Sequence, residues 1–220
     1  MYSRTTQFDQ ANSMHSTVGP AETRTLLENV RWETYVDLAD SRRGSVPRMT
    51  YFEGMLELMN PSRQHENIGC LIGRMVETYT EVQGIEIQSV ASTTFKRQEI
   101  KKGFEADESD YVQHAEQIRV KEEVDLKIDP PPDLVIEVEI TTSAIPKMVL
   151  FAAMGVPEVW RHDGEQLTMH LLSGGKYESI EESSTLPGYT IAMVEAILDK
   201  RFEIGETALI RSFRESLSLR

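Results

Sequence analysis

The sequence predicts an α/β protein with a mixed central sheet flanked by helices, and three observations support this. The stretch at residues 133–141, Asp-Leu-Val-Ile-Glu-Val-Glu-Ile-Thr, is rich in β-branched and aliphatic residues and follows three prolines that keep a helix from entering it. Residues 65–82 carry apolar side chains at helical spacing. Shorter apolar runs separated by glycine-containing turns are typical of hairpins.

Length and composition limit the class of protein. With 220 residues and 40% apolar content, the chain can form one sizeable core. A single cysteine, Cys70, excludes an intramolecular disulfide framework and fits a reducing compartment; its apolar neighbours predict a buried, inert thiol. No apolar run approaches membrane-spanning length. We therefore expect a soluble, cytoplasmic protein with no membrane partner.

Net charge bears on the partners. A formal charge of −13 argues against purely electrostatic, non-specific binding to nucleic acid. It does not exclude an enzyme that meets phosphates through a metal ion and a local basic patch.

The first quarter of the chain predicts a tail, a helix and a hairpin. Residues 1–25 are polar and aperiodic, so we expect a mobile N-terminal tail followed by a single domain over 26–220. Residues 28–40 show helical spacing. Two short apolar runs within residues 49–59 surround Glu53-Gly54, and this glycine supplies the positive φ that a tight turn needs.

The strongest helical pattern begins after Asn60-Pro61-Ser62 and covers residues 65–82, with Gly84 just beyond its end. His65 lies in the first turn, where the helix dipole disfavours imidazolium. The ring is then expected to be neutral and able to bind a metal or accept a proton. The alternative is a surface or capping histidine.

Strands are expected at residues 85–90 and 93–95, followed by the basic cluster, which we define as Lys96, Arg97, Lys101 and Lys102. This cluster either balances nearby acidic residues or contacts a phosphate backbone. The acidic run at residues 103–112 contains Asp107, just ahead of a short strand. Asp107 is well placed to project into a cleft, although an acidic turn also explains the run.

Glu137 and Glu139 lie on one face of the strand at 133–141, with Cα atoms roughly 6.5 to 7 Å apart. Two carboxylates in one place of low dielectric need a cation, a shared proton or access to water. A divalent metal is one solution. The alternative is an edge strand with both side chains in solvent.

The chain after this strand predicts a helix that starts near Lys147 and stops at Gly155. Lys147 can reach back towards the carboxylates, although an exposed lysine is the ordinary interpretation. A hairpin follows over residues 156–172, and helices are expected at 191–199 and 206–217.

Three segments resemble the Uma-type endonucleases of the PD-(D/E)XK nuclease superfamily. They are Tyr-Phe-Glu-Gly-Met-Leu-Glu-Leu-Met-Asn-Pro-Ser…His-Glu at 51–66, Pro-Pro-Asp-Leu-Val-Ile-Glu-Val at 131–138, and Gly-Val-Pro-Glu-Val-Trp at 155–160 after Lys147. The resemblance covers about residues 30–200. It implies a restriction-endonuclease-like core, a Mg²⁺ or Mn²⁺ cofactor, and hydrolysis of phosphodiester bonds in nucleic acid, with DNA the expected substrate. Because the superfamily often acts in pairs, a homodimer is expected, with the apolar hairpin after Trp160 as a symmetric contact.

The resemblance also implies roles for individual residues. Asp107, Glu137 and the backbone carbonyl of Val138 take the positions of the metal ligands. Glu139 stands where the superfamily has its lysine, so that role passes to Lys147, which orients the attacking water. His65 is expected to face the same cleft. Ala106 and Pro146 also depart from the pattern: Ala106 replaces a proline, which matters little for the chemistry, and Pro146 stands where a polar or acidic residue is expected before the lysine.

The leading hypothesis is a metal-dependent endonuclease. The alternative is a catalytically inactive module of the same fold that binds a protein or nucleic-acid partner. The glutamates and Lys147 favour the enzyme, whereas the acidic balance and the lack of a DNA-reading motif favour the module.

Overall fold

A computed structural model describes residues 22–42, 44 and 46–218. Most of the predicted tail, residues 1–21, lies outside the described residues. Its last three residues are in strand β1 (Thr23–Leu27), which pairs with β3, so the tail was predicted to extend too far. The largely exposed side chains of this edge strand explain the error, because polar residues 23–25 followed by two leucines give no alternating apolar pattern.

The first sheet is antiparallel, with the strand order β1-β3-β2-β6-β5. Besides β1, it contains β2 (Arg48–Phe52), β3 (Met55–Asn60), β5 (Thr94–Arg97) and β6 (Lys102–Glu105). The predicted hairpin is confirmed as β2–β3. Glu53 and Gly54 both have positive φ angles, of 50° and 86°, as a tight hairpin turn requires.

The second sheet is mixed, with the order β11-β10-β9-β8-β7-β4 and one parallel pair, β8–β9. Its strands are β4 (Gln88–Ser89), β7 (Glu108–Tyr111), β8 (Leu134–Val138), β9 (Glu158–His162), β10 (Leu167–Ser173) and β11 (Lys176–Ile180). This confirms the predicted mixed sheet. The strand predicted at 85–90 is reduced to two residues, and β11 was missed.

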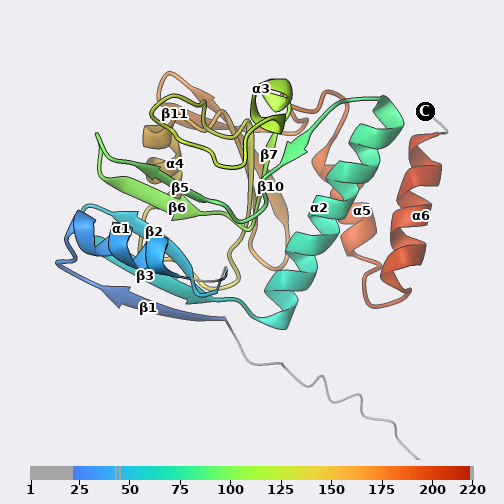
Figure 1. The fold of residues 1–220 in the computed structure, drawn as a ribbon. Coiled ribbons are helices and arrows are strands. Elements are labelled where there is room, and N and C mark those ends of the chain that lie inside the picture. The colour runs from blue at the N-terminus through green and yellow to red at the C-terminus, as the bar shows by residue number, and fades with distance from the viewer. Residues whose placement is uncertain (1–21, 43, 45, 219–220) are drawn as a thin grey trace, which may run out of the picture.

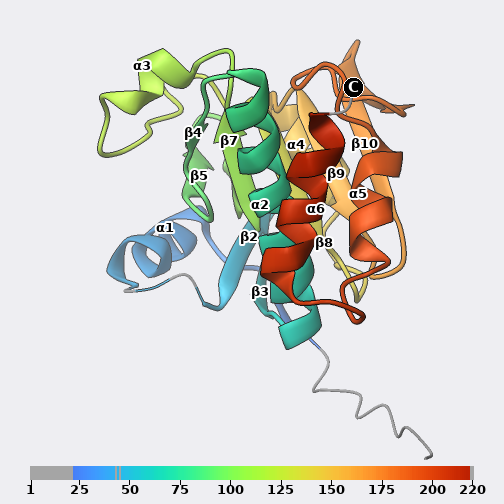
Figure 2. The same ribbon diagram turned by 90° about the vertical axis from the view of Figure 1, so that its right-hand side faces the viewer.

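Six helices occur among the described residues: α1 (Trp32–Ser41), α2 (Arg63–Gln83), α3 (Ala115–Arg119), α4 (Lys147–Met154), α5 (Ile191–Leu198) and α6 (Glu206–Leu217). In Figures 1 and 2, α2, α5 and α6 lie together on one side of the molecule, while α1, β1, β2 and β3 lie in the lower part of Figure 1. The helix predicted at 65–82 is confirmed as α2. The Ser62 hydroxyl accepts from the His65 N–H, and Gly84 ends α2 in the left-handed conformation.

Strand β8 separates two apolar cores, as its alternating side chains predict. Leu134, Ile136 and Val138 pack with α2, α5 and α6, whereas Val135 packs with α4 and the first sheet. Glu137 therefore projects to the α4 side of β8. Apolar residues enclose both faces of the strand, so the alternative of an edge strand with Glu137 in solvent is wrong.

Two surface expectations are wrong. Cys70 is exposed, because it lies on α2 outside the apolar stripe. The hairpin β9–β10 is not an exposed apolar contact: Leu167 and Met169 are buried in the core shared with α5. The β9–β10 hairpin therefore does not offer the exposed apolar surface that a symmetric dimer contact would need. Within the described part of the chain, no helix is both long and apolar enough to cross a membrane.

Candidate active site

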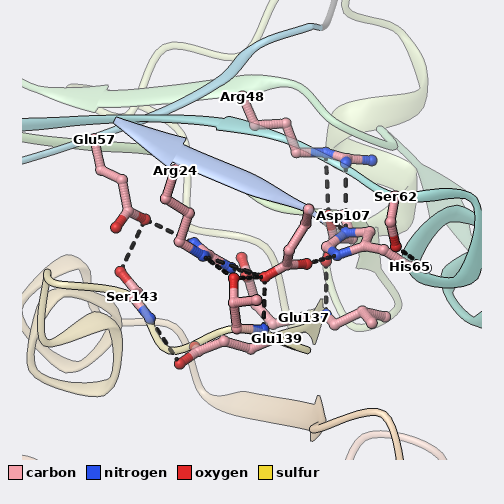
Figure 3. Close-up of polar contacts among 12 residues, drawn as sticks. Arg24, Arg48, Glu57, Ser62, His65, Asp107, Glu137, Glu139 and Ser143 are labelled. Atoms are coloured by element: carbon pink, nitrogen blue, oxygen red, sulfur yellow. Dashed lines mark hydrogen bonds and ion pairs between the residues drawn. The ribbon is translucent and has the colours of Figure 1, made fainter. Parts of the chain in front are cut away.

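Asp107 lies in the tight connection between β6 and β7 and is buried, yet each of its oxygens has a partner. Oδ1 is 2.8 Å from His65 Nε2 and 3.1 Å from Arg48 Nε. Oδ2 accepts the Val138 backbone N–H at 2.6 Å. Burial alone raises the pKa of this carboxyl, but the hydrogen bond and charge of His65 and the charge of Arg48 lower it overall. Asp107 is therefore an anion fixed against the end of β8 (Figure 3).

His65 is fully buried between two carboxylates, with Nδ1 2.8 Å from Glu22 Oε2 and Nε2 2.8 Å from Asp107 Oδ1. Burial alone lowers the pKa of its ring, but the hydrogen bonds to Asp107 and Glu22 raise it to about 9. The expected neutral ring is wrong, because two adjacent carboxylates outweigh the helix dipole. As an imidazolium, His65 donates from both nitrogens and has no lone pair for a metal.

Glu137 and Lys147 form a buried pair, with side chains 1% and 6% exposed, in which Lys147 Nζ donates to Glu137 Oε2. The other oxygen, Oε1, is buried and has no partner among the described residues. Burial and the charge of Asp107 raise the pKa of Glu137, while Lys147 opposes the rise. The lysine is thus not the exposed residue of the ordinary interpretation. It reaches back from the first turn of α4, as the helix position predicted.

Glu139 has different partners from Glu137. Its Oε1 accepts the Ser143 N–H at 3.2 Å, and its Oε2 is 3.1 Å from Nη2 of Arg161. Its charge is still close enough to raise the pKa of Glu137. Glu139 therefore belongs to the start of the loop after β8, while Glu137 forms the pair with Lys147.

Sequence reasoning missed four charged residues that surround this group: the buried Glu22, Arg48 and Glu57 and the half-buried Arg24. Arg48 and Glu57 lie in otherwise apolar strands, which is the same signal that singled out Glu137. Arg24 donates to Glu57 Oε1 at 2.7 Å and to Glu22 Oε1 at 2.8 Å. Glu22 and Arg24 fell within the segment interpreted as a tail, so no local pattern pointed to them.

The contacts of the basic cluster favour the first of its two interpretations, in which its cations interact with other groups of the protein. Lys96 donates to Asp40, and Lys102 lies 3.6 Å from Glu53 and 4.2 Å from the centre of the Phe52 ring. Arg97 donates to the Met154 carbonyl at 3.4 Å. Three of its four cations are thus engaged with the protein itself.

The oxygen ligands offered by Asp107 and Glu137 suit a hard cation that keeps some of its bound water molecules. No cluster of three or more His, Cys, Asp or Glu side chains able to hold a metal occurs in the described part of the chain. Asp107 and Glu137 offer two carboxylates, and Glu137 Oε1 is an unpartnered buried acceptor. Mg²⁺ is commonly held by one or two carboxylates together with waters and substrate phosphates. These residues therefore fit Mg²⁺ or Mn²⁺ better than a metal that needs a complete protein cage.

Comparison with known proteins identifies a family and a similar fold. Residues 32–204 match the model of the Uma2 family, described as "Putative restriction endonuclease". The chain is also similar to a crystal structure from Anabaena variabilis, titled as a putative nuclease belonging to DUF820. The TM-score is 0.56 at 14% identity, over 76% of this chain and 98% of that one. At that identity the likeness shows a shared fold. No curated protein matches.

Proposed function

The chain belongs to the Uma2 family, and on that premise we propose that it is a metal-dependent endonuclease that hydrolyses phosphodiester bonds in DNA. The observation that carries the proposal is the buried Glu137–Lys147 pair, with one free carboxylate oxygen, beside Asp107. A buried charged group is costly unless it is paired, and a partly satisfied group is more costly still. Its presence here favours a catalytic use of the free oxygen.

In this proposal Asp107, Glu137 and the Val138 carbonyl hold Mg²⁺ or Mn²⁺. The bound ion would polarise the phosphoryl group and lower the pKa of the attacking water. Asp107 and Glu137 are both close to Lys147, whose pKa they raise although burial alone lowers it. The lysine is therefore a fixed cation, suited to stabilising negative charge that develops on phosphate oxygens and to orienting water.

His65 and Arg48 act through Asp107 in this account. Both are cations, and both contact Oδ1. They keep Asp107 ionised and fix the direction of its carboxylate. We assign them to holding the proposed ligand and not to proton transfer.

The cellular compartment, the substrate and the oligomeric state are also part of the proposal. The single cysteine supports the cytoplasm, where disulfides are rare. DNA as the substrate is inferred from the family description. A homodimer stays a prediction, and the oligomeric mass in solution decides it.

One observation favours the inactive binding module instead. Every oxygen of Asp107 already contacts His65, Arg48 or the Val138 N–H, and Asp107, Glu137 and Lys147 are at most 6% exposed. Such a closed site needs side chains to move before a phosphate can approach. In the module, this movement does not occur and no cleavage follows.

Nicking of supercoiled plasmid DNA, with RNA as a parallel substrate, tests the choice. Wild-type protein with Mg²⁺ or Mn²⁺ should nick the plasmid, and chelator should stop it. Glu137→Gln should be inactive, whereas Glu86→Gln, a change of the same type at an exposed position, should retain full activity. A wild type inert on both nucleic acids with either metal would favour the module.

A further inference from the structure

We propose that Glu22 is a positioning residue of this site: its carboxylate connects His65 and Asp107 to residues 139–146, the segment between Glu137 and Lys147. The catalytic part of this inference rests on the proposed function. Its structural part does not.

The Glu22 carboxylate is buried, and its two oxygens face different parts of the site. Oε2 accepts from His65 Nδ1 at 2.8 Å. Oε1 accepts from the Thr141 N–H at 2.8 Å, from the Thr141 hydroxyl, and from Arg24 Nη2 at 2.8 Å. One side chain thus joins α2 to the loop that follows β8.

The connection through Oε2 continues to the proposed metal ligands. His65 uses its second nitrogen to donate to Asp107, and Asp107 accepts the backbone N–H of Val138. Glu22 therefore fixes the direction of the His65 ring, and the ring fixes the carboxylate of Asp107. Orienting partners of this kind are commonly needed to hold metal ligands in place.

The connection through Oε1 holds the segment that leads to Lys147. Residues 139–146 contain no helix or strand, so side-chain contacts decide their path. Arg24 Nε donates to the Thr141 hydroxyl at 3.1 Å. Glu57, the ion-pair partner of Arg24, accepts from the Ser143 hydroxyl at 2.9 Å and the Ala144 N–H at 3.0 Å (Figure 3). The segment is therefore tied down at three residues before α4 begins.

Glu22 and Arg24 lie before residue 32, where the match to the family model begins. Figure 3 shows Arg24 on β1, reaching towards the same group of side chains as Asp107 and His65. Glu22, just ahead of β1, and Arg24 on β1 thus add a buried and a partly buried charge to a site whose other members lie within the matched region. We infer that this N-terminal segment completes the site in this chain.

Glu22→Gln tests the inference, because an amide has one acceptor oxygen and cannot accept from both His65 and Thr141. The matched control is Glu28→Gln, an exposed glutamate just after β1. The measurements are kcat and KM for plasmid nicking, and amide hydrogen exchange of residues 139–146. We expect kcat to fall by about 10- to 100-fold with KM nearly unchanged, because small displacements of catalytic groups have effects of this size. Exchange at Thr141 and Ala144 should become faster, and the control should match the wild type.

Unchanged exchange in a folded Glu22→Gln protein would overturn the inference, and so would faster exchange with wild-type kcat. If Glu22→Gln does not fold, Thr141→Val is the second variant, because it removes the hydroxyl that donates to Glu22. It should lower kcat and speed exchange in residues 139–146 by smaller amounts. Wild-type kcat and wild-type exchange in Thr141→Val would also overturn the inference. If the wild type cleaves nothing, the proposed function fails, and the exchange result alone decides whether Glu22 positions the segment.

Discussion

Asp107 and its neighbours Glu108 and Asp110 are carboxylates in one short stretch, yet their pKa values are shifted in opposite directions. Burial is the largest influence on all three, and it favours the neutral acid. For Asp107, the contacts with His65 and Arg48 reverse this influence and lower the pKa. For Asp110, burial together with the charge of Glu77 raises the pKa to about 6, and for Glu108, burial and the charge of Asp110 raise it to about 7.

Glu108 and Asp110 line a pocket of about 150 Å³ beside α2, whose other lining residues are Cys70, Gly73, Arg74, Glu77 and Ser89. The one cation in this lining, Arg74, pairs with Glu206 of α6 at 3.1 Å. The cationic partner of each carboxylate, and not the type of acidic residue, therefore decides which carboxylate is kept ionised. In the candidate site, cations stabilise the ionised Asp107, whereas in the pocket burial favours the neutral acids of Glu108 and Asp110.

The largest effect is expected at Lys147. Lys147→Met should reduce metal-dependent nicking by about 100-fold or more, because it removes a fixed cation from the place where charge develops. It should also lower the free energy of unfolding by about 3 kcal/mol near neutral pH, because Glu137 loses its buried partner. Steady-state kinetics and urea denaturation measure the two effects. Wild-type turnover in a folded Lys147→Met protein would remove the lysine from the mechanism.

The next effect concerns the pH dependence of stability. The pKa of His65 is raised from its ordinary value of 6.5 to about 9 in the folded protein. The stabilisation is therefore complete below about pH 6.5 and is lost as the pH rises towards 9. The loss should amount to about 3 kcal/mol.

Urea denaturation at pH 6 and at pH 9.5, with chelator present, measures this loss. His65→Gln should remove most of the difference between the two pH values. A wild type whose stability is equal at both would show that the ring is neutral in the folded protein.

A smaller effect of opposite sign is expected in the acidic pocket. Asp110 has a folded pKa of about 6, above its ordinary value of 3.8, so the folded state is penalised as the pH rises through this interval. Asp110→Asn should raise the free energy of unfolding by about 2–3 kcal/mol at pH 8 and leave it nearly unchanged at pH 3.5. A destabilised variant at pH 8 would mean that a cation compensates this pocket after all.

The smallest effect is expected in the basic cluster. Lys96 is engaged with Asp40, so Lys96→Ala should leave nicking within about twofold of the wild type and weaken folding by less than 1 kcal/mol. Salt titration of plasmid binding by both proteins checks this. A clear decrease in the salt dependence of binding would place Lys96 on the nucleic acid.

Much of the fold could be predicted because its elements carry local signals. The apolar stripe of α2, the turn at Gly54 and the alternation in β8 each required only a few neighbouring residues. The Glu137–Lys147 contact also followed from local order, because α4 begins shortly after β8 ends. Strand β1 has none of these signals. Its Arg24 and the preceding Glu22 contact residues that are 33 to 119 positions away in the sequence, so no local pattern reveals their role.

The charge state of the site could not be predicted for the same reason. The helix position of His65 predicted a neutral ring, whereas Glu22 and Asp107, each more than 40 residues away, make it a cation. Asp107 and Asp110 likewise look alike in a sequence. Their difference arises from Arg48 and His65, which the tertiary structure brings to one of them only.

The central claim is that a metal ion binds at Asp107 and Glu137 and not in the neighbouring acidic pocket. Titration with Mn²⁺, followed by electron paramagnetic resonance of the free ion, tests this most directly in the wild type, Glu137→Gln and Asp110→Asn. The wild type should bind Mn²⁺ at one site, which should be lost in Glu137→Gln and retained in Asp110→Asn. Retention in Glu137→Gln together with loss in Asp110→Asn would contradict the claim.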